Sequence, residues 1–228
     1  MEQSPTSHLK LLALPLFQGI TQQELHKLAA HARFHFQKLN SGITFIKEGE
    51  ACKDLFFLLQ GKIEITTSAA NNSFIVKEWL ETPSVIQPER LLGLSPWFSS
   101  TYTTQEKSSI LSIDKESILS FIEHSFVFRI NFMNILSTRI QKMERQQWRP
   151  SSYSLRERVI RFFEQHVYNI GGEKIFFIKM ITLAKEMNVK RIKVSNVLNE
   201  LQNEHLLKLE RGRIIIPALE KLIQKAQL

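Results

Sequence analysis

The chain has 228 residues, of which 43% are hydrophobic and 23% are charged, a composition that excludes a disordered or collagen-like chain. No apolar run approaches the roughly 18 residues of a membrane span, and the single cysteine, Cys52, excludes an intramolecular disulfide. The net charge of +8 is concentrated at one end, because residues 149–228 carry 15 Lys and Arg against 8 acidic residues, while residues 1–148 carry 15 against 14. We therefore expect a cytoplasmic protein of one or two domains whose basic end binds a polyanion such as nucleic acid.

Residues 1–114 are expected to form a β domain that begins with a helical segment. Residues 7–34 have helical apolar spacing, and Thr21 and Glu24 are separated as in a capping box. Short runs rich in Ile, Phe, Leu and Thr then alternate with turn residues: FHFQKL, ITFIKEG, LFFLLQGKIEITT, FIVKEWL and SSILSID. Several short strands at this spacing predict an antiparallel sandwich or barrel.

Residues 115–148 are expected to form one long helix. No Gly or Pro occurs from Lys115 to Gln147, and apolar residues recur at steps of three and four. A helix of about 33 residues is about 50 Å long, more than a small domain needs. We expect one edge to pack on the β domain and the other on the same helix of a second chain, although Arg129 and Arg139 interrupt the apolar row. The expected dimer contacts are Ile122, Phe132, Leu136 and Met143. A long core helix of a monomer is the alternative.

Residues 149–228 have the pattern of a compact DNA-binding domain. Pro150 ends the long helix, and the segment ITLAKEMNVKRIKVSNVLNELQ (181–202) predicts a helix-turn-helix. Thr182 is expected to cap its first helix. The second helix is expected to begin near Lys190 and to bury a set of residues at helical spacing: Val194, Val197, Leu198 and Leu201. The alternative is a solvated basic helix pair in another kind of domain.

The outward residues of this second helix are the candidate DNA contacts, because the recognition helix enters the major groove by its N-terminal end. A hairpin at 206–216 then predicts a wing with Arg211 and Arg213 at its tip. Arg and Asn can read base edges, whereas Lys and Ser suit phosphates. The expected DNA-binding residues are Thr182, Lys190, Arg191, Lys193, Ser195, Asn196, Arg211 and Arg213.

The order of these parts resembles the Crp/Fnr family of bacterial transcription regulators. The similarity is carried by LPLFQGITQQELHKLA (14–29), GITFIKEGEACKDLFFLLQGKIEI (42–65) and LAKEMNVKRIKVSNVLNELQNEHLLKLERGRIII (183–216). The resemblance implies an α+β protein with an N-terminal antiparallel double-stranded β-helix (jelly-roll-like) sensor domain at 1–114, a dimerisation helix at 115–148 and a winged helix-turn-helix at 149–228. It further implies a homodimer, double-stranded DNA with an inverted-repeat operator, RNA polymerase as a partner and a small-molecule effector.

Individual positions depart from the family pattern. Arg191 matches the base-reading arginine, but Ile192 stands where many members have Glu, and Asn196 where many have Arg. We therefore expect an operator that differs from the commonest one of the family.

The effector pocket also departs from the pattern of members that bind cyclic nucleotides, which have Gly-Glu followed by Arg-Ser. Glu89 matches the glutamate, but Pro88 replaces the glycine, and Tyr102 and Thr103 fall where Arg-Ser is expected. No arginine lies between Arg90 and Arg129 in the sequence. A buried phosphate without a guanidinium would lose a charge-assisted contact, so we do not expect cyclic AMP to bind in the usual mode. The effector is unknown, and Glu89 is expected to be a surface residue.

No cofactor, metal site or catalytic arrangement is expected. One cysteine cannot hold an iron–sulfur cluster or a structural zinc, and an inert thiol is favoured over a redox sensor at Cys52. A haem ligand among His26, His31 and His35 is disfavoured. Two other protein classes stay open: an effector-independent architectural or protein-interaction dimer with a β-roll scaffold, and an enzyme or carrier on a cupin-like barrel. The latter is weak because His35 is the only histidine in the β region.

Overall fold

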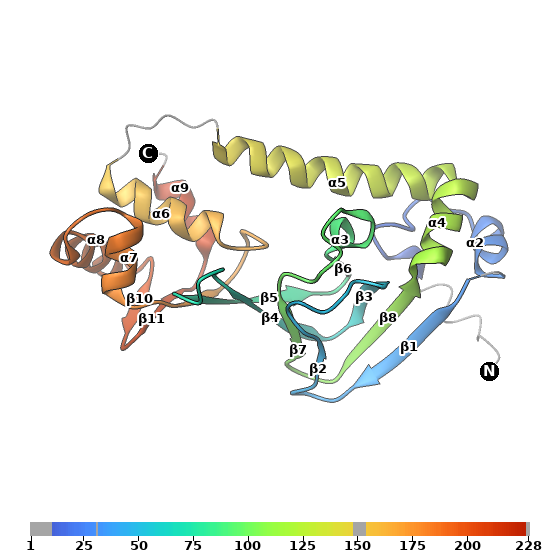
Figure 1. The fold of residues 1–228 in the computed structure, drawn as a ribbon, viewed down its shortest axis with the longest axis horizontal. Helices are drawn as coiled ribbons and strands as arrows, with labels where there is room; N and C mark the ends of the chain where they lie inside the picture. Colours follow the sequence, from blue (N-terminus) through green and yellow to red (C-terminus); the bar gives the residue numbers. More distant parts are fainter. Residues whose placement is uncertain (1–10, 31, 148–153, 227–228) are drawn as a thin grey trace. The chain divides into compact units, whose positions relative to one another are not determined.

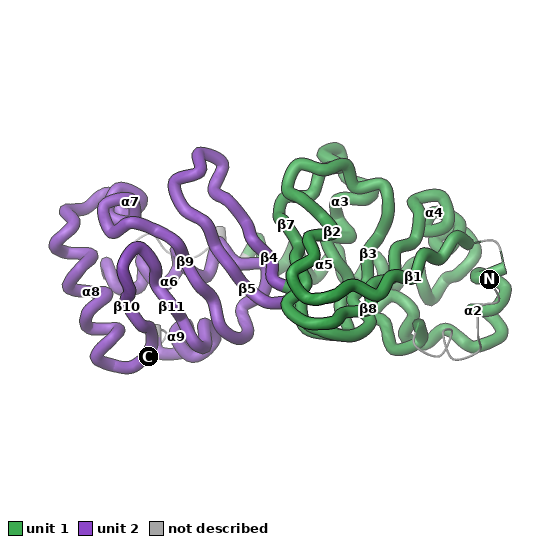
Figure 2. The backbone as a smooth tube through the Cα atoms, turned by 90° about the horizontal axis from the view of Figure 1, so that it is seen from below, with its two compact units in different colours: residues 1–63, 80–147 green, residues 64–79, 148–228 purple. Residues whose placement is uncertain are grey.

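The computed structural model describes residues 11–30, 32–147 and 154–226. By their contacts they form two compact units (Figure 2). Unit 1 comprises residues 1–63 and 80–147, and unit 2 comprises residues 64–79 and 148–228. Residues 64–79 were expected to belong to the β domain, but they pack with the C-terminal segment. No helix of the described residues is both long and apolar enough to span a membrane.

Unit 1 is built on antiparallel strands, as the alternating apolar runs predict (Figure 1). One sheet has the order β1-β8-β3-β6, and β2 pairs with β7. The central strand β3 buries Leu55, Phe57 and Leu58, and Phe57 is paired with Leu111 of β8. The strands are β1 (Phe34–Leu39), β2 (Thr44–Ile46), β3 (Asp54–Gln60), β6 (Ser84–Ile86), β7 (Thr101–Thr104) and β8 (Ser108–Asp114).

Four helices of unit 1 are described: α2 (Gln22–Ala29), α3 (Pro88–Leu92), α4 (Lys115–His124) and α5 (Phe126–Gln147). α2 lies within the segment expected to be helical, and Thr21 caps it by accepting a hydrogen bond from the Glu24 amide, as its spacing predicts. Phe17, Phe121 and Phe128 form an aromatic cluster with ring centroids 5.2 to 6.1 Å apart. This cluster packs α4 and α5 against the N-terminal segment.

The prediction of one continuous helix over 115–147 is wrong, because the chain leaves the helical conformation at Ser125 (φ −121°, ψ 112°). The Ser125 hydroxyl accepts a hydrogen bond from the Phe128 amide at 3.2 Å, which caps α5. The same hydroxyl donates to Glu24 Oε1 of α2 at 2.6 Å. A buried serine that bonds both to the next helix and to a distant carboxylate favours a helix end over helix continuation.

The described residues of unit 2 form four helices and the strands β10, β11, β9, β5 and β4, which are hydrogen-bonded neighbours in that order. The helices are α6 (Leu155–Gln165), α7 (Met180–Glu186), α8 (Arg191–Asn203) and α9 (Leu219–Ala226). The strands are β4 (Lys62–Ser68), β5 (Ile75–Glu81), β9 (Lys174–Phe177), β10 (Lys208–Glu210) and β11 (Arg213–Ile216). Ser154 and Glu157 form a capping box at the start of α6. The helix-turn-helix and the wing hairpin thus appear where the sequence predicts them.

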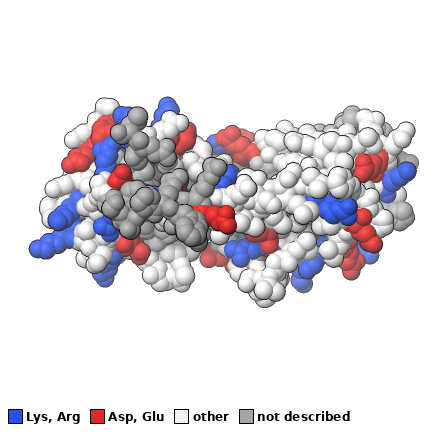
Figure 3. All heavy atoms as spheres, turned by 90° about the horizontal axis from the view of Figure 1, so that it is seen from above, with Lys and Arg blue, Asp and Glu red and all other residues white. Residues whose placement is uncertain are grey.

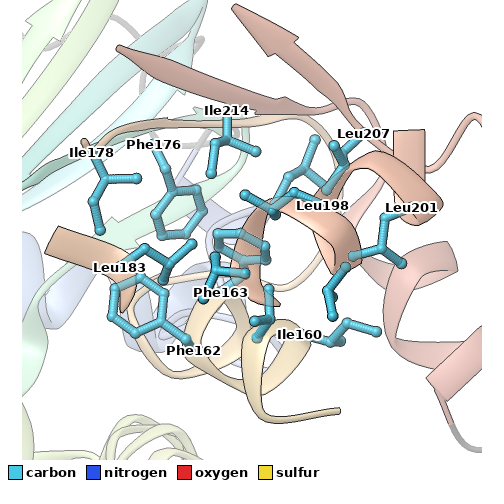
Figure 4. Packing of buried hydrophobic residues seen from close by; sticks show 14 of the residues in the cluster. Ile160, Phe162, Phe163, Phe176, Ile178, Leu183, Leu198, Leu201, Leu207 and Ile214 are labelled. Carbon is cyan, nitrogen blue, oxygen red and sulfur yellow. The ribbon is translucent and has the colours of Figure 1, made fainter. Parts of the chain in front are cut away.

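The core of unit 2 gathers apolar side chains from α6, α7, α8 and α9 and from β5, β9 and β11 (Figure 4). Phe162 and Phe163 of α6 face Phe176 of β9, and Leu183 and Leu198 of the helix-turn-helix pack beside them. The hairpin of residues 64–79, formed by β4 and β5, contributes to the same core. Phe74 lies 5.1 Å from Phe162 and 5.0 Å from His166, measured between ring centroids. Because Val76 of β5 is also buried in this cluster, the hairpin is part of the unit's core rather than an appendage.

Candidate DNA-binding surface

The turn between α7 and α8 has the geometry of a helix-turn-helix. Asn188 adopts a left-handed conformation (φ 48°), which reverses the chain within a few residues. The Val189 amide then donates to Ala184 O at 3.1 Å, and the Val189 side chain packs against the core. These contacts hold α7 and α8 at a fixed angle to each other. They involve neighbouring residues of the turn, and the sequence pattern already predicts a helix-turn-helix at these positions.

Two arginines of α6 hold the helix-turn-helix at both ends of α8. Arg158 donates to the Met187 carbonyl oxygen in the turn before α8. Arg156 makes a two-pronged ion pair with Glu204, the residue that caps α8, with N–O distances of 2.5 and 2.7 Å. This interaction raises the pKa of Arg156 and lowers that of Glu204. The recognition helix is therefore oriented by α6 as well as by its apolar face.

The structure confirms the expected inward face of α8 and leaves the expected contact residues outside. The four predicted apolar residues are buried. Lys190, Arg191, Lys193 and Asn196 are exposed, and Ser195 is half-buried. Thr182 differs from its expected role: the cap of α7 is Lys179, and Thr182 lies half-buried within the first turn.

The N-terminal end of α8 concentrates positive charge. Lys190 is its capping residue, Arg191 and Lys193 follow in its first turn, and that turn contains no acidic residue. Figure 3 shows Lys and Arg side chains along the edge of unit 2 at the end that carries α8 in Figure 1. The dipole of a helix makes its N-terminus positive, so cations there are unfavourable unless an anion binds. The stability of α8 itself therefore does not explain why these three cations lie at its N-terminal end.

Two open grooves flank this end of α8. One has a volume of about 610 Å³ and lies between α7 and α8, where Lys185 and Lys193 line it. The other has a volume of about 450 Å³ and lies between the start of α8 and the wing, where Arg191, Arg213 and Lys179 line it. The cations Lys179 and Lys185, which lie at the two ends of α7, were not among the predicted contacts.

The wing places Arg211 and Arg213 differently. Arg211 is exposed beside Gly212, whose φ of 76° forms the turn. Arg213 Nε donates to Glu210 Oε2 at 2.5 Å, and Lys208 Nζ lies 2.8 Å from Glu210 Oε1. These two cations lower the pKa of Glu210. Glu210 thus partly neutralises Arg213 and fixes its direction, whereas Arg211 has no such acidic partner among the described residues.

Of the expected effector residues, Glu89 and Tyr102 both interact with Arg139 of α5, whereas Thr103 has a different partner. Tyr102 is fully buried, while Thr103, its neighbour on β7, has its hydroxyl 2.8 Å from that of Thr44 at the sheet surface. Glu89 was expected to be a plain surface residue, but it is half-buried and ion-paired with Arg139 of α5. Both Glu89 and Tyr102 interact electrostatically with Arg139, whose pKa is lowered by burial. The guanidinium that pairs with Glu89 therefore comes from α5, 50 residues further along the chain.

Cys52 is buried, and burial raises the pKa of its thiol to about 11, with Glu89 and Asp54 contributing to the rise. A raised pKa opposes formation of the thiolate, which is the reactive form. The described geometry therefore agrees with an inert thiol.

The helix α5 has two distinct faces. Its inner face includes Phe128, Phe132 and Asn131, whose amide donates to the carbonyl oxygens of Leu16 and Gln18 at 3.2 and 2.8 Å. Phe132 was expected at a dimer contact but is only 4% exposed, within its own chain. Ile122 and Leu136 are half-buried, and Met143 is exposed. The exposed apolar residues follow each other along the outer face and comprise Phe126, Ile130, Met133, Ile140 and Met143.

An antiparallel β domain, followed along the chain by a long helix and a winged helix-turn-helix, defines a class of DNA-binding proteins. Residues 36–125 match the model of the cyclic nucleotide-binding domain, and residues 157–225 match the model of the Crp-like helix-turn-helix domain. Together these matches show that the chain belongs to the Crp/Fnr family of transcription regulators.

Solved structures show the same fold at low sequence identity. The catabolite activator protein of Thermus thermophilus is 20% identical, with a TM-score of 0.53, over 93% of this chain and 99% of that one. A putative regulator of the Crp/Fnr family from Eubacterium rectale is also 20% identical, with a TM-score of 0.52 and the same coverage. No curated protein sequence gives a significant match.

Proposed function

We propose that the protein is a homodimer that binds an inverted-repeat DNA operator through α8 of each chain and responds to an effector other than cyclic AMP. The observation that carries DNA binding is the group of exposed cations Lys190, Arg191 and Lys193 at the positive end of α8. DNA phosphates supply the anionic partner that this arrangement needs, and the end of the helix suits the major groove.

The roles of the contact residues follow from their chemistry and position. Arg191 projects from the first turn of α8, and its planar fork suits guanine O6 and N7. Asn196, five residues further along α8, is a second candidate for base contact. Phosphate contacts are assigned to the other residues of the surface: Thr182, Lys190, Lys193, Ser195, Arg211 and Arg213.

Selection of bound duplexes from a random pool tests this proposal. A two-fold dimer should select an inverted repeat with half-sites about 34–36 Å apart. On the selected duplex, Arg191→Ala should cost about 1–3 kcal/mol and relax the preference at one position, whereas Lys193→Ala should weaken all sequences alike and reduce the salt slope by about one. Lys221→Ala, an exposed cation on α9, is the matched control and should change neither quantity.

Two outcomes would contradict the assignment at different levels. A selected motif that is unchanged by Arg191→Ala removes base reading from that residue. Failure to select any motif at any salt concentration favours an effector-independent architectural dimer over a sequence-specific regulator.

Support for the dimer comes from the outer face of α5. Its exposed apolar residues recur at steps of three, four and seven, the spacing of a seam between two helices. Seen from the side on which α5 lies, the surface over this helix carries few charges (Figure 3). A second copy of α5 would remove these side chains from water and would place two recognition helices in one molecule.

The proposed exclusion of cyclic AMP rests on the ion pair between Glu89 and Arg139. In the usual mode the glutamate binds a ribose hydroxyl and an arginine binds the phosphate, but here each group is the partner of the other. Binding would have to break a half-buried ion pair. Calorimetry should detect no binding of cyclic AMP, and micromolar binding that Glu89→Ala abolishes would refute this part of the proposal. RNA polymerase is a partner implied by the family, and we assign no residues to it.

A further inference from the structure

Two isoleucines interrupt the polar surface of the helix-turn-helix. Ile192 of α8 is 64% exposed and Ile181 of α7 is 56% exposed, which makes them the most exposed of the large apolar side chains described in unit 2. Each lies in the first turn of its helix, and Ile181 lines the groove that also contains Arg191.

Neither packing nor helix propensity explains Ile192. The buried face of α8 is formed by Val194, Val197, Leu198 and Leu201, and residue 192 is two positions before the first of them, about 200° around the helix. A β-branched residue is also a weaker helix former than Ala or Lys. Ile192 therefore adds no core contact and leaves an apolar side chain in water between Arg191 and Lys193.

Given the DNA binding proposed above, on which this step rests, we infer that Ile192 reads thymine through its C5-methyl group. The major groove presents hydrogen-bonding groups at every base pair, but only thymine adds an apolar methyl. Consecutive residues of a helix point about 100° apart, so Arg191 and Ile192 face different positions of the same half-site. Contact between the isoleucine and a methyl group removes both from water.

The partner must be the floor of the major groove rather than the phosphate backbone. Phosphates are anionic and strongly hydrated, so contact between an isoleucine side chain and a phosphate contributes no favourable binding free energy. Exposed cations flank Ile192 on both sides and are suited to hold the backbone while the isoleucine reaches the base edges. The recognition helix thus combines a hydrogen-bonding reader, Arg191, with an apolar one.

Uracil-containing DNA isolates this contact, because deoxyuridine differs from thymidine only by the methyl group. The duplex selected in the preceding experiment is synthesised with deoxyuridine at one thymidine per half-site at a time, and affinity is measured by fluorescence anisotropy at fixed salt. One position should weaken binding by about three- to fivefold per half-site, as expected for the loss of one buried methyl group.

The decisive variant is Ile192→Ala in the full-length protein. It should bind the thymidine and deoxyuridine duplexes equally, and its thermal stability should not fall, since the side chain is exposed. Ile181→Ala is the matched control, because it removes the same atoms from a similarly exposed isoleucine on α7. This control should retain the full preference for thymidine.

Three results separate this inference from the proposed function. If the protein selects a motif but binds thymidine and deoxyuridine duplexes equally at every position, Ile192 does not read thymine, while the regulator proposal stands. If the preference survives in Ile192→Ala, another residue or the shape of the DNA reads the methyl group, and the inference is wrong. If no motif is selected at all, the proposed function fails first.

Discussion

Glu78 and Lys174 form a buried ion pair in the interior of unit 2. Each residue is 1% exposed, and Lys174 Nζ lies 3.9 Å from Glu78 Oε2. The Glu78 carboxylate also accepts hydrogen bonds from the amides of Tyr168 and Asn169 at 2.6 and 2.9 Å. Lys174 Nζ donates to Gly171 O at 2.7 Å. Both charges are therefore satisfied, but each is removed from water.

Burial raises the pKa of Glu78 to about 7 and lowers the pKa of Lys174. A carboxyl group whose pKa is higher in the folded than in the unfolded chain contributes stability that is complete below the unfolded value, about 4.3. That contribution is lost as pH rises through about 7. We predict that the free energy of unfolding decreases between about pH 4.3 and pH 7 through this group, by a few kcal/mol at most, because one pKa unit corresponds to about 1.4 kcal/mol.

Urea denaturation across this pH range, compared between the protein and Glu78→Gln, measures the effect. Gln does not titrate, so the wild type should lose stability relative to the variant as pH rises. Lys174→Met should move the loss to higher pH, because the lysine charge lowers the pKa of Glu78. Parallel pH profiles for wild type and Glu78→Gln would contradict the assignment.

At the level of single residues, the sequence could not predict buried ion pairs such as the one between Glu78 and Lys174. Glu78 lies in an alternating strand, and its side chain could equally well have faced solvent. Its partner is nearly a hundred positions away in the chain. The same holds for Glu89, whose partner Arg139 was interpreted only as an interruption of an apolar row. Long-range ion pairs leave no spacing signal, whereas the contact residues on α8 lie at helical spacing from a clear apolar face.

Among the elements, α5 offers the clearest test, because its two faces should respond differently to a charge. We predict that Met133→Asp and Ile140→Asp, at side chains 55% and 57% exposed, convert the proposed dimer to a monomer that remains folded. A carboxylate in an apolar interface would be desolvated without a partner. Analytical ultracentrifugation measures the mass, and DNA affinity should fall with it.

Two further α5 variants separate association from folding. Asn134→Asp introduces the same charge at an exposed polar position of α5 and should leave the dimer intact. Phe132→Asp should instead unfold or strongly destabilise the chain, because its ring is buried within unit 1. A dimer that persists in Ile140→Asp would mean that α5 is not the interface.

The positions at which helices begin and end also show which features of the fold can be predicted from sequence patterns. The start of α8 and its buried face were predicted because four apolar residues within eight positions identify one helix face. The break at Ser125 was missed because no Gly or Pro marks it. It arises from hydrogen bonds of a serine hydroxyl to Phe128 and to Glu24, and the latter lies 101 residues away. The apolar periodicity continues across Ser125, so it gives no indication that one helix ends there and another begins.

At the scale of the whole molecule, the hairpin of residues 64–79 belongs to the same compact unit as the C-terminal segment, so the two should fold together. A fragment of residues 149–228 lacks Phe74 and Val76, and it leaves Lys174 without its carboxylate. We predict that this fragment unfolds at a lower urea concentration than one in which residues 64–79 are joined to it by a flexible linker. Burial of the Phe74 ring alone is worth about 1.5–3 kcal/mol.

A control with the same linker and a hairpin carrying Phe74→Ala and Glu78→Gln should restore little of that stability. Equal urea midpoints for the short fragment and the joined one would show that the hairpin is dispensable. The hairpin was assigned to the β domain from the sequence because its alternating pattern is that of any amphipathic strand. Its docking depends on the pairing of β5 with β9, where Ile75 meets Phe177 and Glu78 meets Lys174.

The interrupted course of unit 2 along the chain constrains how such a regulator can be recombined. A chimera made by a single crossover in the segment around Pro150 would unite the C-terminal part of this protein with a foreign hairpin. The residues facing Phe162, His166 and Lys174 would then come from the other parent. Exchange of DNA-binding specificity between relatives therefore calls for two additional crossovers around residues 64–79, or for co-inheritance of Phe74, Val76 and Glu78 with their C-terminal partners.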